Sequence, residues 1–181
     1  MIEVLALITS VAAAVVSVVF ARRAQRMSEI DQQTQIVALN REYHSELRAW
    51  ADGAVEALTS AIFLCDLRDD CISDSDFRLR KLGVKEQLSA LIDRGRFFFP
   101  NTLPDTHGQV KPAAYRGFRP QALDHLVHSY EILRRLESRP VDANHSHRGD
   151  LWHLRKLFVS DLQQVLNPKE REAELKALMP D

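Results

Sequence analysis

An apolar run near the start of the chain is long enough to cross a lipid bilayer. Residues 4–20 are seventeen consecutive positions without a charged side chain. At about 1.5 Å of rise per residue, a helix from Ile2 to Phe20 is about 28 Å long, which is close to the ~30 Å thickness of the hydrocarbon layer. Such a helix satisfies its own backbone polar groups in lipid, so the many valines of the run do not exclude it. The sequence therefore predicts a transmembrane anchor over residues 1–21.

Basic residues lie on one side of this run. Arg22, Arg23 and Arg26 follow it directly, whereas Glu3 is the only charged residue before it. Because the cytoplasmic flanks of membrane spans are enriched in Lys and Arg, these arginines are the predicted topology signal. We therefore expect a bacterial-style, single-pass protein of the inner (plasma) membrane. Its N-terminus would lie outside, its residues 22–181 in the cytoplasm, and the lipid bilayer would be its first partner.

A cleaved signal peptide is the alternative interpretation of the same run. Signal peptides carry a basic region before their apolar stretch, and only Met1, Ile2 and Glu3 precede this one. Small residues within 19–21 do offer a cleavage pattern, so the alternative stays open beside the preferred anchor.

Beyond the anchor, the chain is patterned for helices. Six glycines and seven prolines among 181 residues are too few for a fold of many short strands and turns. From Ala21 to about Leu64 there is no proline, and apolar residues recur in steps of three and four, as on an amphipathic helix. These positions are Ile36, Leu39, Tyr43, Leu47, Trp50, Ala54, Leu58 and Ala61. We predict a mostly polar helical stalk over residues 22–42, and a packed helix from about Tyr43.

Three further amphipathic segments follow. The second predicted helix begins near Phe77 and ends near Gly95, and the third begins around Pro120. The fourth follows a polar loop over residues 139–149. The apolar positions are Leu82, Leu88, Leu91 and Ile92 in the second helix, Leu123, Leu126, Val127, Tyr130, Leu133 and Leu136 in the third, and Leu151, Leu154, Phe158, Leu162 and Val165 in the fourth.

A short charged helix is predicted at the end of the chain. Asn167 would be its N-cap, Pro168 its first residue and Glu170 the capping partner three positions later. Four amphipathic helices without a strand pattern favour an antiparallel bundle. The predicted fold class is therefore all-α: a transmembrane helix, a long stalk helix and a cytosolic four-helix bundle over residues 43–181.

The segment between the second and third helices combines cations with aromatic rings. Over residues 94–119, five cations face one acid, Asp105. Arginines beside aromatic rings can bind a phosphate or a carboxylate while apolar walls exclude water. The candidate anion-binding residues are Arg94, Arg96, Lys111, Tyr115, Arg116 and Arg119.

A structural role for the same segment is the competing interpretation. In that case Phe97, Phe98 and Phe99 would close the end of the bundle. Arg94 or Arg96 would be buried against acids such as Asp93 or Asp124. A binding role predicts instead that the arginines converge on an open cavity with no carboxylate within reach.

The same segment also carries a family resemblance. Residues 94–101, Arg-Gly-Arg-Phe-Phe-Phe-Pro-Asn, precede Tyr-Arg-Gly-Phe-Arg at 115–119, and an apolar run stands at the N-terminus. This combination resembles a group of small, uncharacterised bacterial single-span membrane proteins, over about half of the chain. The resemblance implies a helical, membrane-anchored protein and carries no activity over to any residue.

Other kinds of site find little support in the sequence. The acidic run of Asp66, Asp69, Asp70, Asp74 and Asp76 lacks the ligand spacing of a calcium loop. Seven histidines include His125 and His128 on one expected helix face, and His145, His147 and His153 near the last loop, without a metal-binding motif. Cys65 and Cys71 are expected to be free thiols. We predict no metal, no cofactor and no catalytic residue.

These observations favour two functions of different classes. The preferred one is a membrane-anchored helical interaction or scaffold module that binds a protein partner or forms a homo-oligomer, with Ile36, Leu39 and Tyr43 as contact residues. The alternative is a sensor or effector that binds a small anion or a nucleotide through residues 94–119. A membrane-bound hydrolase is a third hypothesis. A formal net charge of -1 gives no reason to expect a nucleic-acid partner.

Overall fold

The computed structural model describes residues 2–67, 72–138 and 144–167, with all of their side chains except those of residues 2–16 and 19. Within these ranges the chain forms helices and no strand. The helices are α1 (Ile2–Cys65), α2 (Asp74–Phe98), α3 (Gln121–Arg135) and α4 (His145–Val165), with a short 3-10 turn, η1 (Ala113–Tyr115). The predicted all-α class and the helical bundle are confirmed.

The chain divides into two compact units, one up to His44 and the other over Ser45–Arg171. In the first unit the described apolar side chains of α1 are exposed, namely Val18, Phe20, Met27, Ile30, Ile36, Val37, Leu39 and Tyr43. In the part of the chain whose side chains are described, no helix contains a stretch long and apolar enough to cross a membrane. Nearly all side chains of the predicted span over residues 2–20 lie outside this described part.

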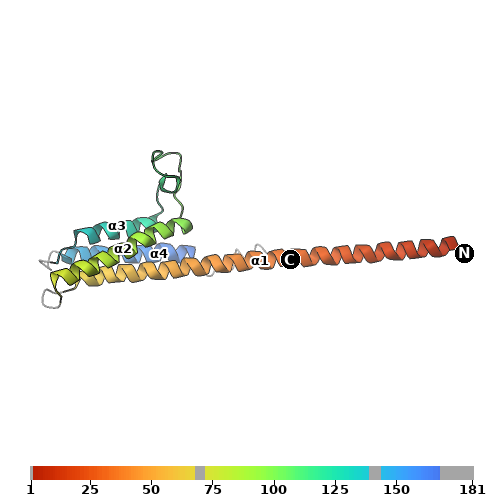
Figure 1. The fold of residues 1–181 in the computed structure, drawn as a ribbon, viewed down its shortest axis with the longest axis horizontal. Helices are drawn as coiled ribbons and strands as arrows, with labels where there is room; N and C mark the ends of the chain where they lie inside the picture. The colour runs from red at the N-terminus through yellow and green to blue at the C-terminus, as the bar shows by residue number, and fades with distance from the viewer. Residues whose placement is uncertain (1, 68–71, 139–143, 168–181) are drawn as a thin grey trace. The chain divides into compact units, whose positions relative to one another are not determined.

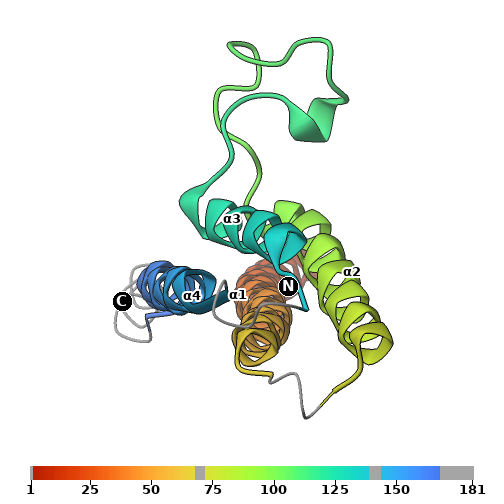
Figure 2. The ribbon, with the colours of Figure 1, turned by 90° about the vertical axis from the view of Figure 1, so that its left-hand side faces the viewer.

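The second unit is a bundle built around the later part of α1. Figures 1 and 2 show α2 and α4 beside this part of α1, and α3 packs against both α2 and α4. Burial begins at Leu47 and continues along one stripe of α1, as the three- and four-residue spacing predicts. The fully buried side chains from the other helices include Leu88, Leu123, Leu126, Leu133, Leu151 and Phe158.

Trp50 organises the core at the end of the bundle that leads into the loop. Its side chain is 6% exposed, and its Nε1 donates a hydrogen bond to the Leu91 carbonyl oxygen at 2.9 Å. The rings of Phe98, Phe99 and Phe158 lie 5.6 to 5.8 Å from it, centroid to centroid. This packing explains why helix α2 ends in phenylalanines, because two of them cover the indole.

Gly95 lets α2 approach the same indole closely. A Cβ atom at this position would lie 2.4 Å from Leu123 Cδ2 and 2.6 Å from Trp50 Cζ2. Both neighbouring side chains are buried, so neither has room to retreat. The glycine therefore serves helix packing, although its place near the end of an apolar pattern suggested a helix end.

Helix α2 is consequently longer than predicted at both ends. It begins at Asp74, three residues before Phe77, because Ser73 Oγ accepts a hydrogen bond from the Asp76 backbone N–H at 3.2 Å. Acids in this first turn also suit the positive end of the helix dipole. At the other end α2 continues to Phe98, with the Phe99 N–H donating to the Gly95 carbonyl oxygen at 2.8 Å.

Several details of the predicted pattern differ from the structure. Helix α4 begins at His145, inside the predicted loop over residues 139–149. Leu82 and Val165 are exposed, although both were assigned to apolar stripes. Of the three phenylalanines predicted to close the bundle, Phe97 is 85% exposed. The predicted C-terminal helix after Asn167 lies outside the described residues.

Candidate functional site

The loop over residues 99–120 projects from the bundle between α2 and α3 (Figure 1). Its two arms are joined where Thr102 and Phe118 exchange backbone hydrogen bonds of 2.9 and 2.8 Å. Gly117 is required beside this pair, since its φ is +80° and a Cβ atom would lie 2.1 Å from the Thr102 carbonyl oxygen. The Gly117 N–H donates to the His107 carbonyl oxygen at 2.8 Å, which closes the loop further. Backbone contacts therefore hold this irregular segment in one shape.

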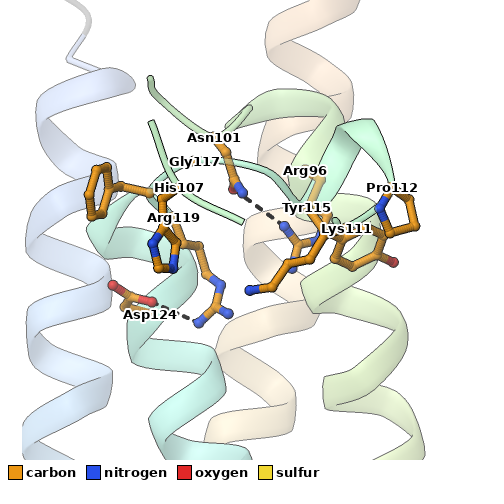
Figure 3. A pocket seen from close by; sticks show the side chains of 10 residues that line it. Arg96, Asn101, His107, Lys111, Pro112, Tyr115, Gly117, Arg119 and Asp124 are labelled. Atoms are coloured by element: carbon orange, nitrogen blue, oxygen red, sulfur yellow. Dashed lines mark hydrogen bonds and ion pairs between the residues drawn. The ribbon is translucent and has the colours of Figure 1, made fainter. Parts of the chain in front are cut away.

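A cavity of about 640 Å³ lies between this loop and the adjoining ends of α2 and α3. Figure 3 shows side chains from both helix ends and from the loop around it. Its size is in the range of pockets that bind small organic ligands. The lining residues are Arg96, Asn101, His107, Lys111, Pro112, Tyr115, Gly117, Phe118, Arg119 and Asp124. We refer to it as the loop cavity.

Arg96 is held rigidly at the wall of the loop cavity. Its guanidinium carbon lies 4.2 Å from the centroid of the Tyr115 ring, a cation–π contact. Its Nη1 donates hydrogen bonds to Asn101 Oδ1 at 3.3 Å and to the Ala114 carbonyl oxygen at 3.4 Å. Asp93 Oδ1 lies 3.5 Å from Arg96 Nε and accepts a 3.0 Å hydrogen bond from the Tyr115 hydroxyl. The side chain of Arg96 is only 11% exposed as a result.

One donor of this guanidinium is left without an acceptor. Arg96 Nε is buried and makes no hydrogen bond to any described residue, because Asp93 is close enough for an ion pair only. Arg119 shows the same arrangement. Its Nη1 donates to Asp124 Oδ1 at 2.8 Å, while its buried Nε makes no hydrogen bond within the described part of the chain. Two buried Nε donors at the cavity wall therefore make no hydrogen bond, although that of Arg96 lies in an ion pair with Asp93.

Lys111 adds a third cation, and its amine is more accessible. The residue is exposed, and no ion pair or hydrogen bond of its Nζ occurs among the described residues. Figure 3 shows its amine extending toward the same space as the Arg119 guanidinium. With Asp124 as the single acid in the lining, the loop cavity carries an excess of positive charge.

Four of the six predicted binding residues line the loop cavity, and two do not. Arg96, Lys111, Tyr115 and Arg119 are brought together there. Arg94 is exposed on α2 outside the lining, and Arg116 donates from Nε to the Lys111 carbonyl oxygen at 2.8 Å, a contact that shapes the loop.

The structure adds residues that the composition of the segment did not single out for binding. Asn101 fixes the loop, because its Nδ2 donates to the Arg116 carbonyl oxygen at 2.9 Å. The His107 ring stacks on the Phe118 ring at 5.5 Å between centroids, with 17° between the planes. Asp124 was considered only as an ion-pair partner, and it does pair with Arg119. As the structural interpretation predicted, Arg96 is buried and pairs with Asp93. The arginines do line an open cavity, but the prediction that no carboxylate would lie within their reach is wrong.

The histidine and cysteine side chains considered as candidates from the sequence do not gather into a second site within the described residues. His125 Nε2 lies 3.0 Å from Asp161 Oδ2, where α3 packs on α4 and away from the lining of the loop cavity. Burial raises the pKa of the Cys65 thiol to about 11, so this thiol is a poor nucleophile at neutral pH. Over the described ranges, no three His, Cys, Asp or Glu side chains gather into a group that could hold a metal ion.

Parts of the predicted acidic run are now placed. Asp66 pairs with Arg148 Nε at 2.7 Å, which links the end of α1 to the start of α4. Asp74 and Asp76 belong to the first turn of α2. Asp69, Asp70 and Cys71 lie outside the described residues.

Comparison of the chain with protein-family models, with curated proteins and with solved structures finds no match.

Proposed function

We propose that the protein is a membrane-anchored helical module that binds a small oxyanion in the loop cavity. The observation that carries this proposal is the gathering of Arg96, Arg119 and Lys111 around one cavity, where Lys111 is exposed and its amine has no ion pair among the described residues. A bound phosphate or carboxylate group would accept charge-assisted hydrogen bonds from the Lys111 amine, beside the Arg119 side chain, which is 32% exposed.

The fixed positions of the arginines support binding further. Arg96 is held by the Tyr115 ring and by two acceptors, so little side-chain freedom is lost when a ligand arrives. Arg119 is held in the same way by Asp124. Guanidinium groups fixed in place favour planar or tetrahedral oxyanions, whose oxygen atoms match the spacing of their donors.

Membrane attachment is the second part of the proposal. It rests on the uncharged run over residues 4–20 and on the arginines that follow it. The bundle over Ser45–Arg171 would then lie on the cytoplasmic side, according to the positive-inside tendency. Fractionation of cells that express the chain tests this part, since the intact protein should remain with the inner membrane after a high-salt wash.

The binding proposal is tested by thermal unfolding of the full-length protein in detergent, with inorganic phosphate, pyrophosphate or citrate. We expect at least one of these anions to raise the midpoint, and Lys111→Ala to weaken its binding roughly tenfold, about the share of one charge-assisted hydrogen bond. Arg94→Ala is the matched control, because it removes a cation next to the loop cavity but not in it. Absence of any shift with all three anions would contradict the proposal.

Self-association along α1 is a second candidate function, favoured by the exposed apolar side chains in the first unit. Ile36 and Leu39 are exposed on α1, and Tyr43 follows one turn later. Copies anchored in one membrane would present the same face at the same height, which favours parallel pairing of identical helices. Crosslinking in native membranes should capture a defined multimer, and Leu39→Asp should abolish it. Recovery of monomers alone from the unsubstituted protein would remove this candidate.

A further inference from the structure

The loop cavity is larger than an inorganic oxyanion needs. Its volume is about 640 Å³, within the roughly 300–1,000 Å³ of pockets for small organic molecules. The three cations account for only part of its lining, and the rest combines rings and loop residues with the side chains of Asn101 and Asp124. A ligand that fills this space therefore has an uncharged part as well as an anionic one.

A flat aromatic surface is available for that uncharged part. The rings of His107 and Phe118 are nearly parallel, with 17° between their planes, and both residues are exposed, Phe118 to 53%. Flat ligand rings stack favourably on such faces, because each π-face offers broad apolar contact. The Tyr115 ring is less suited, since the guanidinium of Arg96 already covers one of its faces.

The backbone that carries the stacked pair is held in place by hydrogen bonds within the loop. The backbone of Phe118 is fixed by two hydrogen bonds with Thr102. That of His107 is fixed by its carbonyl oxygen, which accepts from the Gly117 N–H at 2.8 Å. A loop backbone that is already ordered costs less conformational entropy on binding than one that the ligand must order.

The cations lie beside this surface. His107 and Arg119 line the same cavity, and Figure 3 shows the amine of Lys111 extending toward the space at the Arg119 guanidinium. Asp124 pairs with Arg119 and Asp93 pairs with Arg96, so the amine of Lys111 is the cation of the lining without a carboxylate partner among the described residues. A phosphomonoester suits this group of donors, because its three oxygen atoms can accept from several of them at once.

We infer that the loop cavity takes a phosphate ester of a flat aromatic ring, the chemistry of a nucleotide. The phosphate would lie against Lys111 and Arg119, within reach of the Arg96 guanidinium. The ring would stack on the exposed face of the His107–Phe118 pair. This inference rests on the proposed oxyanion-binding function and adds the ring as a second recognised group.

Calorimetric titration of the full-length protein in detergent tests the inference with three probes. They are adenosine 5′-monophosphate, ribose 5-phosphate and inorganic phosphate. We expect the nucleotide to bind at least about fivefold more tightly than ribose 5-phosphate, the lower end of the gain from stacking one base. In His107→Ala this preference should disappear, while the affinity for ribose 5-phosphate stays the same.

Two further variants separate the parts of the ligand. Lys111→Ala should weaken binding of the nucleotide and of ribose 5-phosphate by a similar factor, because both carry the phosphate. Arg94→Ala should change neither, since Arg94 lies outside the lining. His107 and Lys111 are both exposed, so these substitutions are expected to leave the fold intact, which a circular dichroism spectrum verifies.

The outcomes distinguish this inference from the proposed function. Equal affinity for the nucleotide and ribose 5-phosphate, or a nucleotide preference that His107→Ala leaves unchanged, would overturn the aromatic phosphate ester and leave oxyanion binding standing. If none of the three probes binds, the inference fails, and the binding part of the proposed function then depends on the thermal shifts with pyrophosphate and citrate.

Discussion

The two sides of the α2 C-terminus use similar residues in opposite ways. On the bundle side, the Trp50 ring is surrounded by other rings and its one donor is bonded to the Leu91 carbonyl oxygen. On the loop side, Tyr115 and Phe118 are exposed, and the amine of Lys111 has no ion pair among the described residues. A closed, satisfied cluster stabilises a fold, whereas an open cluster with an accessible cation is suited to a ligand.

The largest expected effect is the loss of the indole from the closed side. Trp50→Ala should lower the free energy of unfolding by about 3–5 kcal/mol, because it leaves a cavity and removes the hydrogen bond to the Leu91 carbonyl oxygen. Urea unfolding followed by circular dichroism measures this change. Trp152→Ala is the control, since that side chain is 45% exposed and should change the free energy of unfolding far less. Equal losses for both variants would contradict a core centred on Trp50.

A smaller effect is expected at the glycine that faces the indole. Gly95→Ala should cost about 1–3 kcal/mol, because the added methyl group meets Trp50 and Leu123 at less than 3 Å. Gly83→Ala on the same helix is the matched control. Its Cβ would meet nothing within 4 Å, so the helix should gain about 0.4–1 kcal/mol from the less flexible residue. Opposite signs in urea unfolding would confirm the close approach, and a stabilising Gly95→Ala would refute it.

On the loop side, a glycine-to-alanine substitution at Gly117 should lower anion affinity more than the free energy of unfolding. Gly117→Ala forces a positive φ on alanine and places its Cβ against the Thr102 carbonyl oxygen, so the loop must open there. We expect anion affinity to fall roughly tenfold or more, which calorimetry measures. The free energy of unfolding should fall by about 1 kcal/mol, because the core of the bundle is untouched. A variant with normal affinity would show that the loop shape does not matter.

The buried thiol of Cys65 should make the free energy of unfolding depend on pH. Burial raises the pKa of Cys65 to about 11 from 9.0, so the unfolded chain loses this proton at lower pH than the folded protein does. Stability from the protonated thiol is then fully present below pH 9 and is lost as the pH rises from about 9 to about 11. Urea unfolding of Cys65→Ala should lack this particular decline. Identical pH profiles for the variant and the unsubstituted protein would contradict the assignment.

The sequence predicts those features of the fold whose cause lies in neighbouring residues of the chain, and misses those that depend on contacts between distant residues. The helices follow from apolar spacing, and the buried stripe of α1 starts at Leu47, close to the expected position. The end of α2 was placed too early, because Gly95 is explained by a contact with Trp50, forty-five positions away. No local pattern reveals such a contact.

The candidate site shows the same limit. Arg94 and Arg96 are equivalent in composition, but residues two apart on a helix point in different directions, and only Arg96 faces the loop cavity. Asn101 and His107 join the site because Thr102 pairs with Phe118 across the loop. That pairing encloses the fifteen residues 103–117, and its register depends on Gly117, whose importance is visible only in three dimensions.

Hydrogen exchange of the full-length protein, measured by mass spectrometry with and without inorganic phosphate, tests the central claim most directly. If the open side binds the anion, phosphate should slow exchange in residues 99–120 and leave the buried stretch of α1 from Leu47 to Cys65 unchanged. The slowing should persist in Arg94→Ala and vanish in Lys111→Ala. Protection that falls elsewhere in the chain, or no change at saturating phosphate, would contradict the loop cavity as an oxyanion site.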